Sequence, residues 1–197
     1  MQILAPRPRA VPFLCLLLAV CAGLATVADA APPRPITHED VWLMKRMGGL
    51  VASPDGRWFV MAVTEPAYED EQRRGDLWLV ASDGAVPSRR LTSGRASESD
   101  PAFSPDSQRI AFTAKRDDDD AAQVYVLDLG GGEARRVTQW PGGARSPRFS
   151  PDGRTMYHTD TPTRIVHAYD YDAATGVPSR RRVFARWSGE TERPDGA

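Results

Sequence analysis

The side chains that could do chemistry in this chain of 197 residues are few and widely spaced. A serine hydrolase of the α/β type needs its nucleophile in a Gly-x-Ser-x-Gly turn, which holds the hydroxyl exposed, and the sequence has no such pentapeptide. The histidines are His38, His158 and His167, and none stands in a motif with a serine or cysteine that would make it a general base. We therefore predict no catalytic residue and no residue that binds an organic cofactor.

Metal ligation is the other chemistry to consider, and its patterns are weak. His158 and Asp160 stand two residues apart, whereas zinc sites cluster more ligands than this. Asp117 to Asp120 is a run of carboxylates, the ligand type that calcium takes, yet between two strands it indicates a solvated loop whose charges repel. Asp170 to Gly176 begins like an EF-hand loop, but Ala174 occupies the third ligand position. We interpret that segment as a turn.

Packing explains the histidines more simply. His38 stands at the start of a predicted helix, where a surface or capping role is expected. His158 and His167 lie in strand-like runs, and we expect packed or half-exposed imidazoles there.

A repeated unit must position these residues, and its marker is the tripeptide Ser-Pro-Asp. Its serine stands at positions 53, 104 and 150, in steps of 51 and 46 residues, a period typical of propellers and solenoids. Proline fixes φ at the second position of a type I turn, and glycine accepts positive φ at the fourth. The phrase therefore predicts a turn. Ser107 replaces the glycine in the second copy, which predicts another turn type or strain.

Three strand-like runs follow each copy of the phrase. They cover residues 57–63, 76–80 and 90–92, then 109–113, 123–128 and 136–138, then 155–158, 164–170 and 182–184. Each unit thus reads as an antiparallel meander of three or four strands, which is one blade of a β-propeller.

We predict an all-β fold: an incomplete, WD40-like propeller over residues 49–197. Its blades are expected at about residues 49–95, 96–141 and 142–190. Because a closed propeller has roughly four to eight blades, three blades leave two sheet edges open. We expect either a fragment of a longer ancestor or a chain whose open edges bind a protein partner.

The N-terminus has the pattern of a signal peptide over residues 1–30. A basic start (Arg7, Arg9) precedes an apolar run and the small-residue site Ala28-Asp-Ala30. A membrane span or a lipid anchor at Cys21 is the less favoured reading. We expect a periplasmic or secreted protein with no membrane attachment after cleavage. Residues 31–48 form a lead-in with a short helix at about 38–47, because Thr37 and Asp40 have the spacing of a capping box.

The net charge and the positions of the cysteines exclude several kinds of binding surface and reactive site. The formal net charge of −1 argues against a nucleic-acid or anionic-lipid surface. Both cysteines, Cys15 and Cys21, lie in the predicted signal peptide. The mature chain is therefore expected to have no disulfide, no thiol nucleophile and no cysteine-bound metal.

The phrases of residues 36–149 resemble the N-terminal propeller of prolyl-oligopeptidase-family peptidases, in the acylaminoacyl-peptidase and dipeptidyl-aminopeptidase branch. TolB-like periplasmic propellers share the same blades. The resemblance implies a propeller that screens access to a separate α/β-hydrolase domain, and it carries over no catalytic residue. The phrases that carry it are Ile36-Thr-His-Glu-Asp40, Leu50-Val-Ala-Ser-Pro-Asp-Gly56, Asp76-Leu-Trp-Leu-Val80, Phe103-Ser-Pro-Asp106 and Gly131-Gly-Glu-Ala-Arg-Arg-Val-Thr138.

The phrases of residues 150–197 resemble the gluconolactonase, regucalcin and senescence-marker-protein family instead. That resemblance implies a sugar lactonase with a divalent ion, calcium or zinc, and it maps one metal ligand onto Asp195. The family's asparagine ligand would fall near residues 145–147, where no asparagine stands. The phrases include Ser150-Pro-Asp-Gly-Arg-Thr-Met-Tyr157, Ala168-Tyr-Asp-Tyr-Asp172, Arg181-Arg-Val-Phe184 and Pro194-Asp-Gly196.

Three functions follow from these patterns. The first is an exported, non-catalytic propeller fragment related to the peptidase propellers, without the hydrolase domain. The second is a truncated, metal-dependent lactonase. The third is a TolB-like periplasmic module that binds a protein partner through its open edges.

Overall fold

The computed structural model describes residues 34–69, 74–94, 97–116 and 118–188. The chain divides into two units, Met1–Ile36 and Thr37–Ala197, and the fold is that of the second. The predicted signal peptide and Asp195 lie outside the described residues. Among the residues that the structure covers, we find no helix with the length and apolar character needed to cross a membrane.

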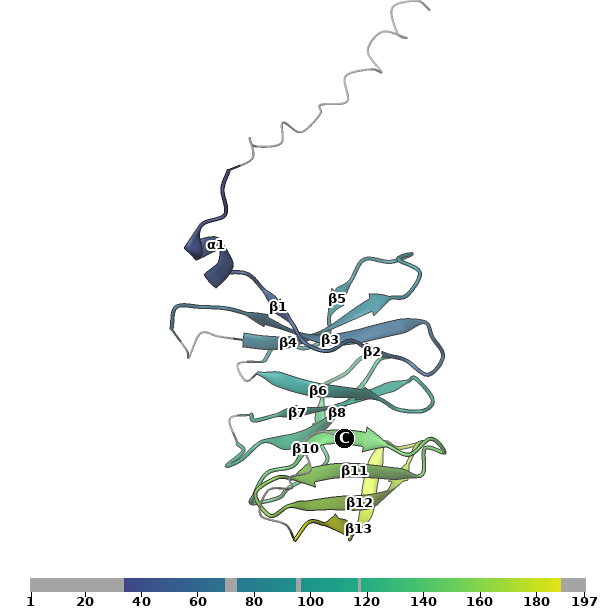
Figure 1. The fold of residues 1–197 in the computed structure, drawn as a ribbon. Helices are drawn as coiled ribbons and strands as arrows, with labels where there is room; N and C mark the ends of the chain where they lie inside the picture. The colour runs from purple at the N-terminus through teal and green to yellow at the C-terminus, as the bar shows by residue number, and fades with distance from the viewer. Residues whose placement is uncertain (1–33, 70–73, 95–96, 117, 189–197) are drawn as a thin grey trace, which may run out of the picture. The chain divides into compact units, whose positions relative to one another are not determined.

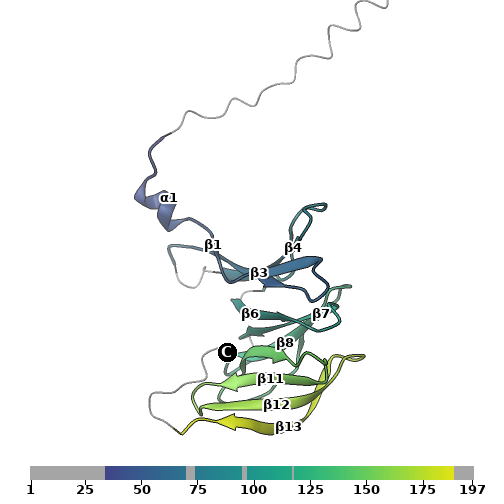
Figure 2. The same cartoon turned by 45° about the vertical axis from the view of Figure 1, so that its right-hand side comes forward.

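Three antiparallel sheets follow one another in chain order, and each is a blade (Figures 1 and 2). All neighbouring strands are antiparallel, as the predicted meanders require. The fold is the predicted all-β partial propeller.

The first blade contains β1 (Arg46–Met47), β2 (Val51–Ala52), β3 (Trp58–Glu65), β4 (Arg74–Ala81) and β5 (Arg89–Arg90). The second contains β6 (Glu98–Phe103), β7 (Arg109–Ala114), β8 (Gln123–Asp128) and β9 (Arg135–Arg136). The third contains β10 (Arg145–Phe149), β11 (Thr155–Asp160), β12 (Ile165–Asp172) and β13 (Val177–Arg186).

The Ser-Pro-Asp turns are the same in all three blades. Each serine hydroxyl donates to the aspartate two residues on, at 2.5 to 2.6 Å. The same oxygen accepts the backbone N–H five residues on, at 2.9 Å. The fourth turn residue has positive φ in each copy, +70° at Gly56, +58° at Ser107 and +69° at Gly153. The predicted turn is therefore confirmed.

Ser107 gives the second copy the same turn type with a non-glycine residue at positive φ, so of the two expected alternatives strain is confirmed and another turn type is wrong. It adopts the left-handed conformation that the glycines have, and its hydroxyl accepts the backbone N–H of Asp55 at 3.1 Å. A glycine could not make this bond, which links the turns of the first two blades.

The first strand of each sheet carries a bulge at an equivalent place, and the sequence reasoning missed these strands. The register shifts by one residue between Ser99 and Ala102 in β6 and between Arg145 and Arg148 in β10. In the first blade the same interruption separates β1 from β2, which both pair with β3. A bulge bends a strand and increases its twist.

The N-terminal helix is shorter than predicted. The capping box is present, with Thr37 and Asp40 bonded reciprocally, but α1 spans only His38–Trp42. The chain then extends so that Arg46 and Met47 pair with β3, and this long-range pairing ends the helix. The helix buries none of its residues.

The core lies between the blades. We call the side of a blade that looks toward the next blade its forward face, and the opposite side its rear face. The first interface joins the forward face of the first blade to the rear face of the second through Val60, Leu77, Leu79, Ile110, Phe112 and Leu127. The second joins Ala111, Val124 and Val126 to Met156, Tyr169 and Tyr171. Burying one such large side chain is worth about 1.5–3 kcal/mol.

Candidate functional site

The strand histidines meet in the second interface, on the rear face of the third blade. His158 pairs with His167 across β11 and β12, and the ring centroids are 5.0 Å apart. His158 is fully buried and His167 is 4% exposed, so the predicted packed imidazoles are confirmed. We call Trp140, His158, Asp160, His167, Tyr169 and Arg181 the polar cluster.

His158, His167 and Asp160 of the polar cluster occupy positions that are aromatic or apolar one blade earlier. Phe112 lies eight residues after the turn serine of the second blade, and His158 lies eight residues after that of the third. By the same count Ala114 corresponds to Asp160, and the cross-strand partner Tyr125 corresponds to His167. The third blade has therefore replaced an aromatic pair with an imidazole pair inside an interface.

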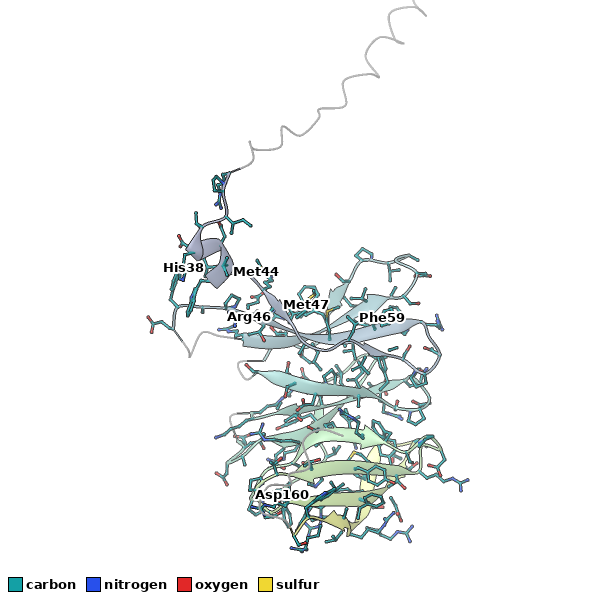
Figure 3. The ribbon with its side chains drawn as sticks, in the orientation of Figure 1. His38, Met44, Arg46, Met47, Phe59 and Asp160 are labelled. Carbon is teal, nitrogen blue, oxygen red and sulfur yellow. The ribbon has the colours of Figure 1, made fainter. Side chains whose placement is uncertain are left out.

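Asp160, at the end of β11 in the third blade (Figure 3), is fully buried and is held by its neighbours. The Trp140 indole N–H donates to Oδ2 at 2.6 Å, and the Thr163 hydroxyl donates to the same oxygen at 2.5 Å. A Cβ atom on Gly142 would come within 3.3 Å of the Asp160 carboxylate. The contacts and the tight packing fix this carboxylate in place.

The two imidazoles have four ring nitrogens, and most of these have no hydrogen-bond partner among the described residues. Nε2 of His158 lies 3.0 Å from the Tyr169 hydroxyl, and His167 packs at 5.0 Å against the Trp140 ring. Nδ1 of His158 and both nitrogens of His167 have no hydrogen-bond partner among the described residues. A buried polar atom without a partner is costly, and an imidazolium would have still more unpaired donors.

A strand bulge brings a cation to the cluster. Tyr169 faces two residues of β13, Arg180 and Arg181, because the register shifts there. Arg180 has positive φ and binds Asp170 at 2.6 Å. Arg181 is thereby turned toward the second blade, where its guanidinium lies 4.1 Å from the centroid of the Trp140 ring, a cation–π contact.

Burial keeps both imidazoles neutral. It lowers the pKa of His158 to about 4, and the adjacent His167 adds to that effect. Burial and then the charge of Arg181 lower the pKa of His167. Burial also raises the pKa of the Tyr169 hydroxyl. At neutral pH the two imidazoles of the cluster are uncharged and buried, so neither ring can reach a dissolved substrate in this conformation.

The acidic run differs from its prediction at one position. The Asp119 side chain is fully buried and accepts hydrogen bonds from the Tyr125 hydroxyl at 2.7 Å and from Arg136 at 2.6 Å. Burial alone would raise its pKa, but these two bonds and that from the Arg116 N–H outweigh burial and lower it. Burial and the bond to Asp119 raise the pKa of Tyr125 to about 12. The expected solvated loop is therefore wrong for Asp119.

The described neighbours of Asp119 in the acidic run are solvent-exposed, as predicted. Asp118 and Asp120 are exposed, and Asp117 lies outside the described residues. In the described part of the chain, no group of three or more His, Cys, Asp and Glu side chains is placed to hold a metal ion.

A cleft of about 400 Å³ beside the first interface contains a carboxylate that the sequence reasoning missed. Glu98 is 2% exposed, accepts a hydrogen bond from the Thr92 hydroxyl and lies 3.6 Å from Arg116. Burial raises its pKa, opposed by Thr92 and by Arg116. Glu98 lies on β6 of the second blade, and Thr92, which donates to it, follows β5 of the first blade. Glu98 therefore links these two blades. No local pattern indicated it, since β6 itself was not predicted.

The remaining predicted positions are structural or undescribed. His38 is exposed on α1 and stacks on Trp42. The segment from Asp170 to Gly176 covers the last three residues of β12 and the turn that joins it to β13. The Asp172 carboxylate accepts bonds from Ala174 and Thr175 of that turn. Arg135 of the second blade donates to two carbonyls of this turn, at 3.0 and 2.9 Å. Asp195 lies outside the described residues.

Comparison with known proteins places these blades among peptidase propellers. Residues 72–190 match the model of the tricorn protease N-terminal beta propeller domain. The chain is 32% identical over 126 residues to an uncharacterized peptidase, YuxL, of Bacillus subtilis, covering 63% of this chain and 19% of YuxL. It is 37% identical over 90 residues to a TolB homolog of Chlorobium luteolum, covering 46% of this chain and 19% of that protein. The fold also resembles the propeller domain of the Trilobed protease from Pyrococcus furiosus, with a TM-score of 0.56, 14% identity and coverage of 73% and 44%.

These identities and coverages limit what the likeness to known proteins shows. The chain spans about a fifth of the length of the two curated relatives, and the solved structure supports the fold alone. The family match covers more than half of the chain and continues to residue 190, through the third blade with its polar cluster. The resemblance of residues 150–197 to lactonases remains a prediction. The chain belongs to the family of the tricorn protease N-terminal β-propeller domain.

Proposed function

We propose that this chain is an exported, non-catalytic propeller module of the prolyl-oligopeptidase type. In this proposal it forms part of a propeller wall and binds other molecules, while peptide cleavage belongs to a hydrolase domain that these residues do not supply. Export rests on the signal-peptide pattern of residues 1–30.

The proposal rests on one observation: the serines and histidines that could do chemistry are bonded within turns or buried between blades. The serine hydroxyls of the three repeats donate to the aspartates of their own turns, and the strand histidines are buried between blades. A nucleophile needs a base within reach and an exposed hydroxyl. These side chains instead hold turns and interfaces together.

A fluorophosphonate probe, which labels activated serines, tests this proposal. We expect the purified chain to take up no label while a serine peptidase such as trypsin in the same tube is labelled. Stoichiometric labelling of a serine in this chain, abolished by its change to alanine, would overturn the proposal.

A metal-dependent lactonase is a second proposal, carried by the Pro194-Asp-Gly196 phrase alone. If Asp195 holds calcium or zinc, either ion should raise the melting temperature, and Asp195→Ala should remove that rise. Asp120→Ala, which removes an exposed carboxylate, is the matched control and should keep it. A wild-type melting temperature that neither ion changes would exclude this proposal.

A TolB-like binding role is compatible with the first proposal. It is supported by the similarity to the Chlorobium luteolum protein and by the apolar side chains on the outer faces of the first and third blades, which include Met47 and Phe184. Such faces are where a propeller module would bind a partner.

A further inference from the structure

The cleft beside the first interface, here called the Glu98 cleft, lies at positions that large side chains fill at the second interface. The Thr92 and Thr138 hydroxyls each accept a backbone N–H at 2.9 Å, from β4 and from β8 respectively, so the two threonines are equivalent. Two residues after each threonine stand Gly94 and Trp140. Gly94 lines the cleft, and the first interface therefore has no side chain where the second has an indole ring.

A second large side chain is missing from the same place. Leu127 and Tyr169 are equivalent, because each lies two residues after the cross-strand pair described above. Arg181 lies beside Tyr169 across β12 and β13. The pairing of β8 with β9, continued by one residue, sets Ala134 beside Leu127, and both of these residues line the cleft. The Glu98 cleft thus lies where the next interface has a stacked indole and guanidinium.

Two polar side chains in the cleft have atoms without a hydrogen-bond partner. Glu98 is 2% exposed, and its Oε1 accepts no hydrogen bond from the described residues. The guanidinium of Arg116 lies 3.6 Å from that oxygen, which is too far for a hydrogen bond. Nε of Arg116 also has no partner in the described part of the chain. Since a buried polar atom without a partner is costly, a ligand that donates to Glu98 would recover this cost.

The charges around Glu98 favour a neutral donor over a cation. Arg116 and Arg90 act on its carboxylate as nearby positive charges, opposed by Asp76. An ammonium or guanidinium ligand would meet both arginines, whereas an aromatic ring can stack on a guanidinium face. The volume of the cleft, about 400 Å³, is within the roughly 300–1,000 Å³ of small-molecule sites.

The second interface contains such an arrangement within the chain. The Trp140 indole N–H donates to the Asp160 carboxylate at 2.6 Å, and the Arg181 guanidinium lies 4.1 Å from the centroid of the ring. The Glu98 cleft has a buried carboxylate and a guanidinium, that of Arg116, but its lining includes no ring. An indole is therefore the group that would complete it.

We propose that the Glu98 cleft binds an indole group, whose ring stacks on the Arg116 guanidinium and whose N–H donates to the Glu98 carboxylate. The group is the side chain of a tryptophan in a bound peptide or a free indole compound, because both offer the same ring and the same donor. Both walls of the cleft belong to described blades of this chain.

Fluorine NMR of 5-fluoroindole mixed with the purified chain tests the proposal. We expect broadening of the fluorine signal that saturates with protein concentration. 5-Fluoro-1-methylindole has the same ring without the N–H, and it should bind about tenfold more weakly, since a hydrogen bond to a charged group is lost.

The amide of N-acetyl-5-fluorotryptophan distinguishes the two sources of the ring. Binding at least as tight as that of 5-fluoroindole would assign the cleft to a tryptophan side chain of a peptide. Weaker binding would assign it to a free indole compound.

Gly94→Trp supplies from the chain itself the ring that the cleft lacks. We expect this variant to keep a cooperative melting transition and to lose the binding of 5-fluoroindole. Gly49→Trp is the matched control, because a Cβ atom there meets no other atom within 4 Å and Gly49 does not line the cleft. It should bind 5-fluoroindole like the wild type.

Three results would each overturn the proposal. They are a wild-type chain that shows no saturable binding of 5-fluoroindole, equal binding of the N-methylated compound, and undiminished binding by a folded Gly94→Trp chain. The comparison of the two indoles uses the wild type alone, so it decides the proposal even if Gly94→Trp does not fold.

Discussion

Replacing His158 with phenylalanine is expected to remove most of the acid sensitivity of this fold between pH 7 and pH 4. In the folded chain burial lowers the pKa of His158 to about 4, whereas an unfolded histidine titrates near 6.5. Protons therefore bind the unfolded chain first as the pH falls. The gap corresponds to about 3 kcal/mol of folding free energy.

The sign follows from which state carries the extra proton. The contribution of a neutral His158 is complete above pH 6.5, decreases as the pH falls from 6.5 to about 4, and changes little below that. His167 acts in the same direction, since its pKa is also lowered. The groups that face the pair are Asp160, Tyr169, Arg181 and Trp140. Arg181 opposes protonation of both rings, and Asp160 favours it.

Phenylalanine is the substitution of choice because the second blade already has Phe112 at the equivalent position. The measurement is the free energy of unfolding by urea at pH 7, 5.5 and 4 for the wild type and for His158→Phe. Glu98 and Asp76 have raised pKa values because they are buried, and they oppose the histidines in this range. They are the same in both chains, so the difference between the two pH profiles isolates His158.

His38→Phe is the matched control, because His38 is exposed on α1. It should leave the wild-type profile unchanged. A His158→Phe chain that loses as much stability between pH 7 and 4 as the wild type would contradict the assignment of the acid sensitivity to this imidazole.

The turns were predictable from the sequence because they depend on neighbouring residues alone. Serine, proline and aspartate supply every side chain that the turn uses, and the bonds repeat in all three blades. The first strands of the blades were not predictable in the same way. Pro101 and Pro147 lie inside β6 and β10, and a proline normally argues against a strand. Here each follows a bulge residue, Asp100 or Ser146, with positive φ.

The candidate site, too, has one part that the sequence could predict and one part that it could not. The sequence indicated strands for His158 and His167, and the alternation of faces could have placed them opposite the apolar pair of the second blade. Their complete burial depends on the stacking of one blade on another, which involves residues far apart in sequence. Glu98 could not be found locally, because its partners Thr92 and Arg116 belong to different blades.

Asp119→Ala is expected to destabilise the fold by about 2–3 kcal/mol, while Asp120→Ala should change stability by less than about 0.5 kcal/mol. The difference arises because only the Asp119 carboxylate is buried, where it holds the Tyr125 hydroxyl and Arg136. Removal leaves the Tyr125 hydroxyl and the Arg116 N–H without an acceptor. The estimate is below the usual cost of breaking a buried pair, because Arg136 is 35% exposed and water can solvate it.

Urea unfolding at pH 7 is the appropriate measurement, since the lowered pKa of Asp119 keeps it ionised there. Its contribution is present above the ordinary aspartate pKa and is lost only as the pH falls through the lower folded value, outside the range in which His158 acts. Asp119→Asn should fall between the two alanine variants, because the amide oxygen still accepts a bond but the charge facing Arg136 is gone. Equal effects at positions 119 and 120 would mean that the run is the solvated loop that its composition suggests. A large effect at 119 alone would show that burial between strands, and not the number of carboxylates, determines what an acidic run does.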